Sequence, residues 1–313
     1  MTRNFFKTYL TTKEVAELLD VNEKIVYQLI TEKGLPATKI TGKWLFPRHL
    51  VQEWLESHVI NHPGTSVKFQ KNLLIIVGSN DLLLERTINL FNKLYPESPA
   101  VFGLIGSFGG LKILKERHCH IAGAHLLESN EKEYNFAYLK EYLNEPLPAV
   151  INFCFREQGL LLAPGNPKGI NSIKDLARKD VILANRPCGT GTRLLLDHEL
   201  QKAGIKPEQV KGYKNEFPSH LDVGIEVLSG RADVGIGIKA VASLLGLEFI
   251  PLRRERYDLF IPRDVFFEEH VQRFLSLLQE KRFYRLAEEL SDYDVSQAGK
   301  MIFPKSHKKG GSL

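Results

Sequence analysis

The sequence predicts an α/β protein of two units, a small N-terminal unit of helices and a hairpin and a larger unit of alternating strands and helices. The chain has 313 residues, which is enough for about two domains. Residues 1–60 contain three amphipathic helical patterns around one alternating segment, and from residue 71 onwards strand-like and helical patterns follow each other. The hydrophobic fraction of 43% and the charged fraction of 25% are those of an ordinary globular protein.

The N-terminal unit begins with two predicted helices. Thr11 or Thr12 can cap the first helix. Its apolar stripe comprises Val15, Ala16, Leu18 and Leu19. The second helix covers residues 23–33 and ends at Gly34, because glycine readily adopts the left-handed conformation that closes a helix. Its inward side chains are expected to be Ile25, Val26, Leu29 and Ile30.

A hairpin and a third helix complete this unit. Residues 38–46 alternate around Gly42 as in a small hairpin, and residues 47–58 carry apolar side chains at helical spacing. Two short helices, a tight turn and a hairpin make a winged helix-turn-helix, an arrangement with which proteins read DNA.

The residues of this unit resemble a known family. The run over residues 9–55, YLTTKEVAELLDVNEKIVYQLITEKGLPATKITGKWLFPRHLVQEWL, is similar to the excisionase/MerR-type helix-turn-helix. The resemblance implies that the second helix enters the major groove of DNA and that the hairpin lies along the phosphate backbone. The DNA-binding candidates are then Asn22, Lys24, Tyr27 and Gln28 in the helix and Lys39, Lys43 and Arg48 in or after the hairpin.

The charge of this unit bears on how it would bind DNA. Residues 1–62 carry eight Lys and Arg against seven Asp and Glu, so a single unit would attract DNA weakly. We therefore expect a homodimer that presents two reading helices. The alternative is that these charges are solvated faces of a protein-interaction module.

The expected domain boundaries follow from a change of pattern. Pro63 and Gly64 lie in a stretch with no sustained period, where we place a linker over residues 61–70. The DNA-binding unit then covers residues 1–60, the α/β unit residues 71–292, and a basic tail residues 293–313.

The larger unit opens with three predicted strands, at residues 72–77, 101–105 and 119–122. Ser79, beside Asn80, and Ser107 fall where the first two strands turn into helices. Each serine is therefore expected to cap its helix and to donate a hydrogen bond to a ligand. In an open α/β sheet ligands bind beyond the carboxyl ends of the strands.

The stretch over residues 181–200 has the outline of an anion site. A strand at 181–184 leads into a turn and a helix at 194–200; the turn consists of Gly189, Thr190, Gly191, Thr192 and Arg193. The N–H groups at a helix start are unpaired and carry partial positive charge. Arg193 would add a fixed charge, although it could instead be a surface residue paired with Asp197. The alternative for the whole stretch is an ordinary capped helix.

Several motifs of the larger unit resemble the type II periplasmic-binding-protein fold. The larger unit is similar to that of cytoplasmic regulators in which an excisionase-like helix-turn-helix precedes a molybdate/tungstate-binding-like domain. The motifs that carry these resemblances are N-P-K-G-I-N-S-I-K-D-L-A, N-R-x-x-G-T-G-T-R-x-L-L-D, G-Y-x-x-E-x-x-S-H and G-x-A-D-V-G-I-G. The resemblance implies two lobes around a ligand cleft, joined by crossing segments near residues 151–163 and 247–259. Further expected elements are strands at 247–250 and 257–261 and helices at 268–279 and 282–290.

Other polar side chains of the expected cleft are weaker candidates. His125, His220 and Tyr257 could contact the ligand, with a structural role as the alternative for the histidines. No metal site is expected, because Cys119 and its flanking histidines point to opposite faces of a strand. Cys188 has no base nearby in the sequence, so we expect it to pack as a small residue rather than to act as a catalytic nucleophile.

These observations predict a one-component transcription regulator, without catalytic residues or cofactor, whose larger domain senses an oxyanion, molybdate or tungstate first. Helix starts from both lobes would bind such a dianion with few counter-charges. We expect a cytoplasmic protein without membrane contact, since there is no secretory pattern or long apolar run and the three cysteines are odd in number. The alternatives are a transport-type solute-binding protein, a regulator of another small ligand, and an enzyme such as an anion transferase.

Overall fold

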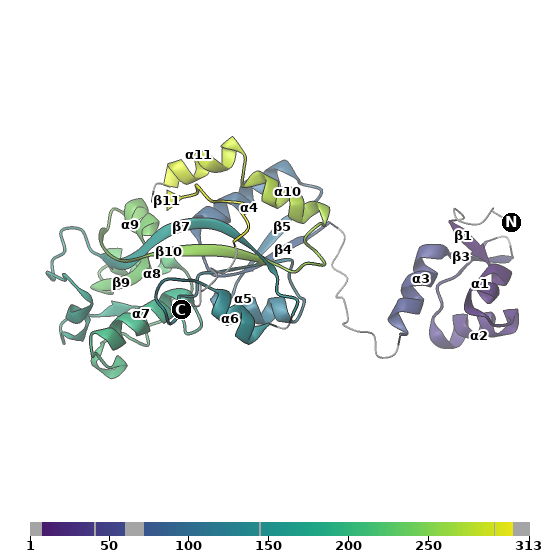
Figure 1. Ribbon diagram of the computed structural model, residues 1–313, viewed down its shortest axis with the longest axis horizontal. Coiled ribbons are helices and arrows are strands. Elements are labelled where there is room, and N and C mark those ends of the chain that lie inside the picture. The colour runs from purple at the N-terminus through teal and green to yellow at the C-terminus, as the bar shows by residue number, and fades with distance from the viewer. Residues whose placement is uncertain (1–7, 41, 60–71, 144, 291, 303–313) are drawn as a thin grey trace, which may run out of the picture. The chain divides into compact units, whose positions relative to one another are not determined.

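The computed structural model describes residues 8–40, 42–59, 72–143, 145–290 and 292–302 (Figure 1). The chain divides into two compact units, residues 1–66 and 67–313, which are described separately. The linker predicted over residues 61–70 lies outside the described residues, as does the end of the basic tail after residue 302. Within the described parts, no helix combines the length and the apolar character that a membrane span requires.

The N-terminal unit has three helices and a three-stranded sheet of order β1-β3-β2. Its elements are β1 (Tyr9–Thr11), α1 (Thr12–Leu19), α2 (Glu23–Lys33), β2 (Thr38–Ile40), β3 (Lys43–Pro47) and α3 (Arg48–Ser57). The predicted helices and hairpin are therefore confirmed, and β1 is an additional strand that pairs antiparallel with β3. Thr11 caps α1, as expected, by accepting from the backbone N–H of Glu14 at 3.3 Å.

The helices of this unit pack around a small core, which consists of Leu10, Val15, Ala16, Val26, Leu35, Phe46 and Val51 with partly buried neighbours. Two expectations about it were wrong. Leu18 is 50% exposed and Ile25 is 37% exposed, so neither side chain belongs to the core. Both helices are short, and only the side chains that face the shared core of the unit are covered.

The larger unit has one mixed sheet of order β5-β4-β6-β10-β7-β9-β8, with β11 added on β7. Its strands are β4 (Leu74–Gly78), β5 (Ala100–Leu104), β6 (Ile121–Ala124), β7 (Ala149–Leu162), β8 (Leu183–Ala184), β9 (Val234–Ile238), β10 (Glu248–Ile261) and β11 (Tyr293–Asp294). Its helices are α4 (Leu82–Leu94), α5 (Gly106–Lys115), α6 (Phe136–Tyr142), α7 (Gly191–Lys202), α8 (His220–Leu228), α9 (Lys239–Leu245), α10 (Glu269–Leu277) and α11 (Lys281–Leu290), with 3-10 turns at Ile173–Ala177 and Pro207–Gln209.

Two long strands join the lobes. β7 and β10 pair antiparallel along their whole length, and β10 also pairs with β6 while the far end of β7 pairs with β9 (Figure 1). We call the part around β4, β5 and β6 the first lobe and the part around β8 and β9 the second lobe. The predicted crossing segments are confirmed. The two strands expected at 247–250 and 257–261 are one strand, because bulges near Pro251 and Tyr257 let β10 continue through its charged middle.

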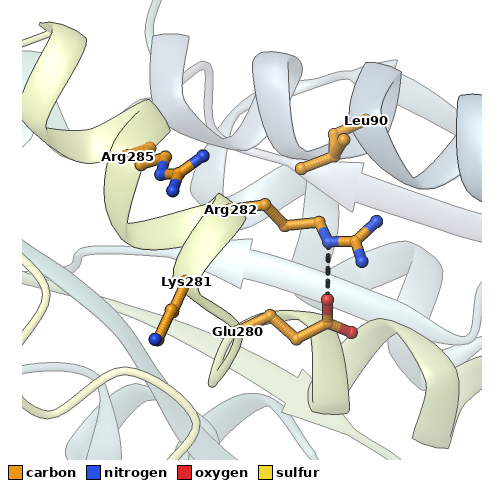
Figure 2. Close-up of a pocket in the computed structure, with 5 residues that line it drawn as sticks. All are labelled: Leu90, Glu280, Lys281, Arg282 and Arg285. Carbon is orange, nitrogen blue, oxygen red and sulfur yellow. Dashed lines mark ion pairs between the residues drawn. The ribbon is translucent and has the colours of Figure 1, made fainter.

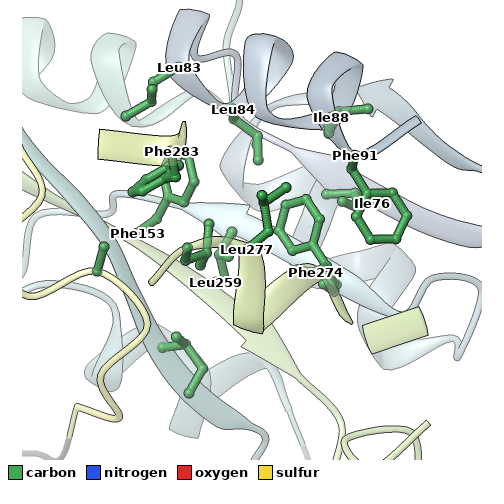
Figure 3. Packing of buried hydrophobic residues seen from close by; sticks show 14 of the residues in the cluster. Ile76, Leu83, Leu84, Ile88, Phe91, Phe153, Leu259, Phe274, Leu277 and Phe283 are labelled. Atoms are coloured by element: carbon green, nitrogen blue, oxygen red, sulfur yellow. The ribbon is translucent and has the colours of Figure 1, made fainter. Parts of the chain in front are cut away.

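The largest core of this unit lies between the sheet of the first lobe and helices α4, α10 and α11 (Figure 3). Phe91 of α4 meets Phe274 of α10 with ring centroids 5.7 Å apart, and Phe153 of β7 meets Phe283 of α11 at the same distance. Because α10 and α11 complete this core, the C-terminal helices belong to the first lobe. β11, in the segment expected to be a tail, pairs with β7 beside them.

A hollow of about 530 Å³ lies on the surface beside α11 (Figure 2). It is lined by Leu90 of α4 and by Glu280, Lys281, Arg282 and Arg285, and the Arg282 side chain pairs with Glu280 at 2.7 Å. None of the site residues expected from the sequence lines it.

Candidate functional site

Segments from both lobes meet where strands β4, β6 and β8 end. Phe108 of α5 donates its N–H to the carbonyl of Gly189 at 3.1 Å, and His220 of α8 donates its N–H to Oδ1 of Asn80 at 2.9 Å. Seven polar side chains gather there, all at most 1% exposed: Ser79, Asn80, Ser107, His125, Arg186, Thr192 and His220. Thr190 lies beside them and is 5% exposed.

The helix starts are capped differently from the sequence expectation. Asp81, not Ser79, caps α4, since its Oδ1 accepts from the N–H of Leu84 at 2.7 Å. Ile105 is the cap residue of α5 and makes no side-chain hydrogen bond, so Ser107 lies in the first turn rather than at the cap. Both expected capping roles were wrong. Thr190 does cap α7, since its Oγ1 accepts from the N–H of Arg193 at 3.2 Å.

Ser79 is instead the end of a buried hydrogen-bond chain. Its Oγ lies 2.7 Å from Nε2 of His125, and Nδ1 of the same ring lies 2.7 Å from Oε2 of Glu255 on β10. Burial lowers the pKa of His125, with Arg156 and Arg186 acting in the same direction and Glu255 opposing them. Burial raises the pKa of Glu255, but the groups around the carboxylate, namely His125, Arg156 and Gln158, outweigh that effect and lower the pKa overall. The ring is therefore neutral beside an ionised carboxylate.

The other oxygen of Glu255 is also occupied. Its Oε1 accepts from Nε of Arg156 at 2.6 Å and from Nε2 of Gln158 at 2.8 Å. Arg156 also pairs with Asp81, so its charge is already matched by two carboxylates. Tyr257, a candidate from the sequence, donates its hydroxyl to the carbonyl of Ser79 at 2.6 Å and stacks on His125, which makes it a support for the Ser79 loop.

Arg186 lies two residues after the end of β8 and is the most unusual group of the site. Its Nη1 donates to the carbonyl of Phe217 at 2.7 Å, whereas Nε and Nη2 have no partner among the described residues, although the side chain is fully buried. Burial and, to a smaller extent, the charge of Arg156 lower the pKa of Arg186 to about 10. Burying a cation with two donors that have no hydrogen-bond partner destabilises the fold unless a negatively charged group compensates it.

Two more buried groups near Arg186 have idle polar atoms. Within the described ranges, the two ring nitrogens of His220 have no hydrogen-bond partner, and the hydroxyl of Ser107 has none either. The pKa of His220 lies well below its usual range because of burial and of the charges of Arg186 and Arg156. Positive and polar groups from both lobes therefore concentrate in one buried place.

Arg193, the expected charged contact, is held by other protein groups. Its guanidinium pairs with Asp197 at 3.1 Å and with Glu216 at 3.0 Å, and it lies over the ring of Tyr213 at 3.9 Å. Nη1 also donates to the backbone carbonyl of Arg186 at 3.1 Å. The ion pair with Asp197 is the alternative that the sequence left open, and Arg193 here supports the turn that carries Arg186.

Sequence reasoning missed four residues of this place: Arg156, Gln158, Arg186 and Glu255. Arg186 could have been found, because it lies just beyond the end of a buried strand, as ligand-binding residues do in α/β sheets. Arg156 and Glu255 lie 99 residues apart in the chain and meet only through the pairing of β7 with β10. No local pattern could show that contact.

Two cysteine and metal expectations also have structural outcomes. Cys188 is exposed, so its predicted packing role was wrong.

Ligand atoms of His120, Glu268 and His270 come within 4.8 Å of one another, a group that the sequence did not connect. Nδ1 of His120 accepts the N–H of Ile75 at 2.9 Å, so the neutral ring carries its proton on Nε2, the nitrogen that faces Glu268. Metal binding there would require that proton to leave.

The expected DNA-contacting residues differ in their availability. Lys24, Tyr27 and Gln28 are exposed along α2, whereas Asn22 caps that helix, its Oδ1 accepting from the N–H of Ile25 at 3.0 Å. In the hairpin, Lys43 is exposed, Lys39 lies 5.5 Å over the ring of Trp44, and Arg48 is half-buried. The indole N–H of Trp54 donates to the carbonyl of Lys33 at 2.9 Å and fixes the end of α2 against α3.

Comparison with known proteins gives two curated relatives. Uncharacterized protein YvgK of Bacillus subtilis (strain 168) is 28% identical over 301 residues, which cover 93% of this chain and 97% of that protein. An uncharacterized protein in the ferredoxin 2Fe-2S gene 5' region of Clostridium pasteurianum is 33% identical over 110 residues, 35% of this chain and 97% of that protein.

Among solved structures, a candidate phosphate ABC transporter substrate-binding protein with bound phosphate from Clostridium perfringens has the same fold. The TM-score is 0.53 at 15% sequence identity, with 71% of this chain and 99% of that chain covered. The predicted fold class, a two-lobed periplasmic-binding-protein-like domain after a helix-turn-helix, is therefore confirmed.

Family models match both units of the chain. The helix-turn-helix domain model matches residues 9–59, and the PBP superfamily domain model matches residues 88–279, more than half of the chain. The protein therefore belongs to the PBP superfamily and carries an N-terminal helix-turn-helix domain.

Proposed function

We propose that this protein is a one-component transcription regulator whose PBP-like domain binds a small oxyanion, with molybdate or tungstate as the first candidates. The observation that carries the proposal is the buried guanidinium of Arg186, two of whose nitrogens have no partner in the described structure. An anion held between the lobes would accept from these donors and would compensate the charge.

Other donors around Arg186 support an oxyanion as the ligand. The hydroxyl of Ser107 has no partner among the described side chains and can donate. The hydroxyl of Thr192 accepts from Gln158 at 3.0 Å, which leaves its own proton for a ligand. These two residues come from different lobes, so an anion that bonds to both would hold the lobes together.

The neighbouring carboxylates favour a fully deprotonated anion. Glu255 is occupied by His125, Arg156 and Gln158, and Asp81 by Arg156, Tyr293 and the N–H of Leu84. A hydrogen phosphate ion would bring an O–H that these two carboxylates are not free to accept, so it would depend on a weaker acceptor such as the hydroxyl oxygen of Ser79, whereas molybdate and tungstate need only donors. Phosphate, the ligand of the Clostridium perfringens protein, is therefore the informative comparison.

The link to DNA would be a change of lobe closure. A ligand that binds the closed lobes more tightly shifts the population toward them, and in a dimer that shift can change the spacing of the two α2 helices. The exposed residues Lys24, Tyr27, Gln28 and Lys43 would then contact bases and phosphates. A cytoplasmic homodimer is part of this proposal.

The test is isothermal titration calorimetry of the full-length protein with molybdate, tungstate, sulfate, phosphate and thiosulfate. We expect binding of molybdate or tungstate, and a loss of affinity of at least about 100-fold in Arg186→Gln, since charged hydrogen bonds contribute about 1.5–3 kcal/mol each. Arg231→Gln, which changes an exposed arginine whose ion pair in the described structure is with Glu226, is the matched control. Absence of heat with every anion would refute the ligand assignment.

DNA binding needs a separate test. Fragments selected from genomic DNA are expected to bind the full-length protein, with an affinity that changes when the oxyanion is added. If no fragment binds in either condition, the regulator assignment fails while the oxyanion assignment stands. That outcome would favour a solute-binding role.

The chain Ser79–His125–Glu255 supports a second candidate, nucleophilic hydrolysis, because a serine, a histidine and a carboxylate follow each other in the order of a catalytic triad. It ranks second because the serine is buried and Arg156 already neutralises Glu255. Hydrolysis of an activated ester that disappears in Ser79→Ala would establish it.

A further inference from the structure

The proton of the Ser79 hydroxyl is already used in a hydrogen bond to His125. An ionised Glu255 can only accept, so the neutral ring of His125 must place its proton on Nδ1, which lies 2.7 Å from Oε2 of that carboxylate. Nε2 is then an acceptor, and the Ser79 hydroxyl 2.7 Å away must donate to it. Ser79 therefore offers a ligand its lone pairs and no proton.

Gln158 does not alter this assignment. Its Nε2 lies 3.2 Å from Nδ1 of His125, but it also lies 3.0 Å from Thr192 Oγ1 and 2.8 Å from Glu255 Oε1. An amide nitrogen has two protons, and these two oxygens use both of them. Nδ1 of His125 thus keeps its own proton for Glu255.

Resting on the proposed function, we propose that oxyanion binding is coupled to protonation of His125. When Nε2 takes up a proton, it donates to Oγ of Ser79, and the Ser79 hydroxyl turns its proton toward the anion. The proton comes from solvent and no covalent bond other than N–H is formed. His125 and Glu255 act as positioning residues, since they determine through Ser79 whether the site offers a donor or an acceptor.

The groups that face His125 make it the place for the proton. From β10, Glu255 and Tyr257 face the ring, and from β7, Arg156 and Gln158. Ser79 faces it from the end of β4. The second lobe contributes the start of α7 together with Arg186 and His220. Glu255 is the only carboxylate that any hydrogen bond of the described structure places on this ring. His220 has no such partner there, so a proton on His220 would gain no comparable stabilisation.

The coupling has a defined sign. Burial and two arginines lower the pKa of His125, so the ring is neutral at neutral pH before the anion binds. The negative charge of the anion raises that pKa, and by linkage protonation raises the affinity for the anion. Affinity for molybdate is therefore expected to fall by up to about tenfold per pH unit as the pH rises from the pKa of His125 in the free protein to its higher pKa in the complex, and to level off above that.

The test measures protons directly. Molybdate is titrated into the full-length protein at pH 7 in two buffers with different ionisation enthalpies, and the difference in heat gives the protons taken up. We expect an uptake that approaches about one proton per anion, because one ring titrates. His125→Gln should bind more weakly and without uptake, whereas His220→Gln, the matched variant, should keep the uptake.

The outcomes separate the two proposals. Binding of molybdate without proton uptake overturns the coupling and leaves the oxyanion site intact, whereas no binding of any oxyanion overturns the proposed function. If proton uptake persists in His125→Gln and is lost in His220→Gln, the proton binds to His220 rather than to His125, and the proposal is refuted. If His125→Gln does not fold, the 15N shifts of the His125 ring in the wild-type protein, with and without molybdate, decide the same question.

Discussion

Gly191 lies directly against the ring of His125. A Cβ atom on residue 191 would lie 2.6 Å from Cε1 of His125 and 2.8 Å from its carbonyl oxygen, distances that real Cβ atoms essentially never show. The glycine starts α7 in the second lobe and the histidine follows β6 in the first, so this contact sets how closely the lobes approach. Gly191 is needed for that close contact rather than for its backbone angles.

Gly191→Ala is therefore expected to weaken oxyanion binding at least about tenfold, equivalent to about 1.4 kcal/mol. The added methyl group meets backbone and ring atoms of His125 when the lobes close, whereas each lobe alone can still fold. Calorimetric affinity and circular dichroism measure the two effects. The control is Gly109→Ala, whose Cβ would have side-chain atoms of Ile105 as its three nearest neighbours, at 3.2 Å and beyond. Equal affinities in both variants would contradict the closure contact.

Arg186→Gln is expected to raise the melting temperature of the anion-free protein by about 2–4 °C, while it abolishes the stabilisation by the anion. The substitution removes a buried cation with two idle donors, whose desolvation is not compensated by a carboxylate contact. Thermal unfolding after exhaustive dialysis, with and without molybdate, measures both.

Arg193→Gln should have the opposite effect. This residue pairs with Asp197 and Glu216, and loss of hydrogen bonds to charged groups costs about 1.5–3 kcal/mol. Its melting temperature should therefore fall in the same experiment. A fall in Arg186→Gln of similar size would show that Arg186, too, stabilises the anion-free fold and would contradict this prediction.

Acid should destabilise the larger unit through its buried histidines. Burial, followed by the charge of His270, lowers the pKa of His120 to about 4 from 6.5. Since the unfolded chain binds the proton more tightly, the stabilisation is complete above about pH 6.5 and is lost as the pH falls toward 4, by about 3 kcal/mol. Urea unfolding between pH 7.5 and 4.5 checks this.

His120→Asn is the variant for that experiment, because its Oδ1 can still accept the N–H of Ile75 and does not titrate. We expect a smaller slope of unfolding free energy against pH between pH 6.5 and 4.5. An unchanged slope would assign the acid sensitivity to other groups, for example His125 or His220, whose pKa values are also lowered by burial.

The helix-turn-helix candidates should separate into two classes. Lys43→Gln is expected to weaken binding to all DNA and to reduce the slope of log affinity against log salt by about one, as for a phosphate contact. Gln28→Ala should cost about 1–3 kcal/mol on the selected sequence and little on random DNA. Lys13→Gln, on the exposed side of α1, is the control. Identical behaviour of all three variants would argue against this orientation of α2.

The sequence alone determined the parts that depend on local patterns. The three N-terminal helices, the hairpin and the Thr11 cap follow from periodicity and turn residues, which act over a few neighbouring positions, whereas the crossing segments came from the resemblance to a known fold. The same rules failed at Ser79, because Asp81 two residues later is the better-placed cap. They also failed at β10, whose charged middle interrupts the apolar pattern but not the strand.

Only the tertiary structure decided what the site is made of. Arg156 meets Glu255 through the pairing of two strands, and His125 reaches Ser79 and Glu255 from a third segment, with separations of up to 130 residues. Whether an arginine is free for a ligand depends on which carboxylates the fold brings to it. From its position in the sequence, Arg193 was the arginine expected to contact the anion, but the fold pairs it with Asp197 and Glu216. The buried Arg186 instead has donors without a partner in the described residues.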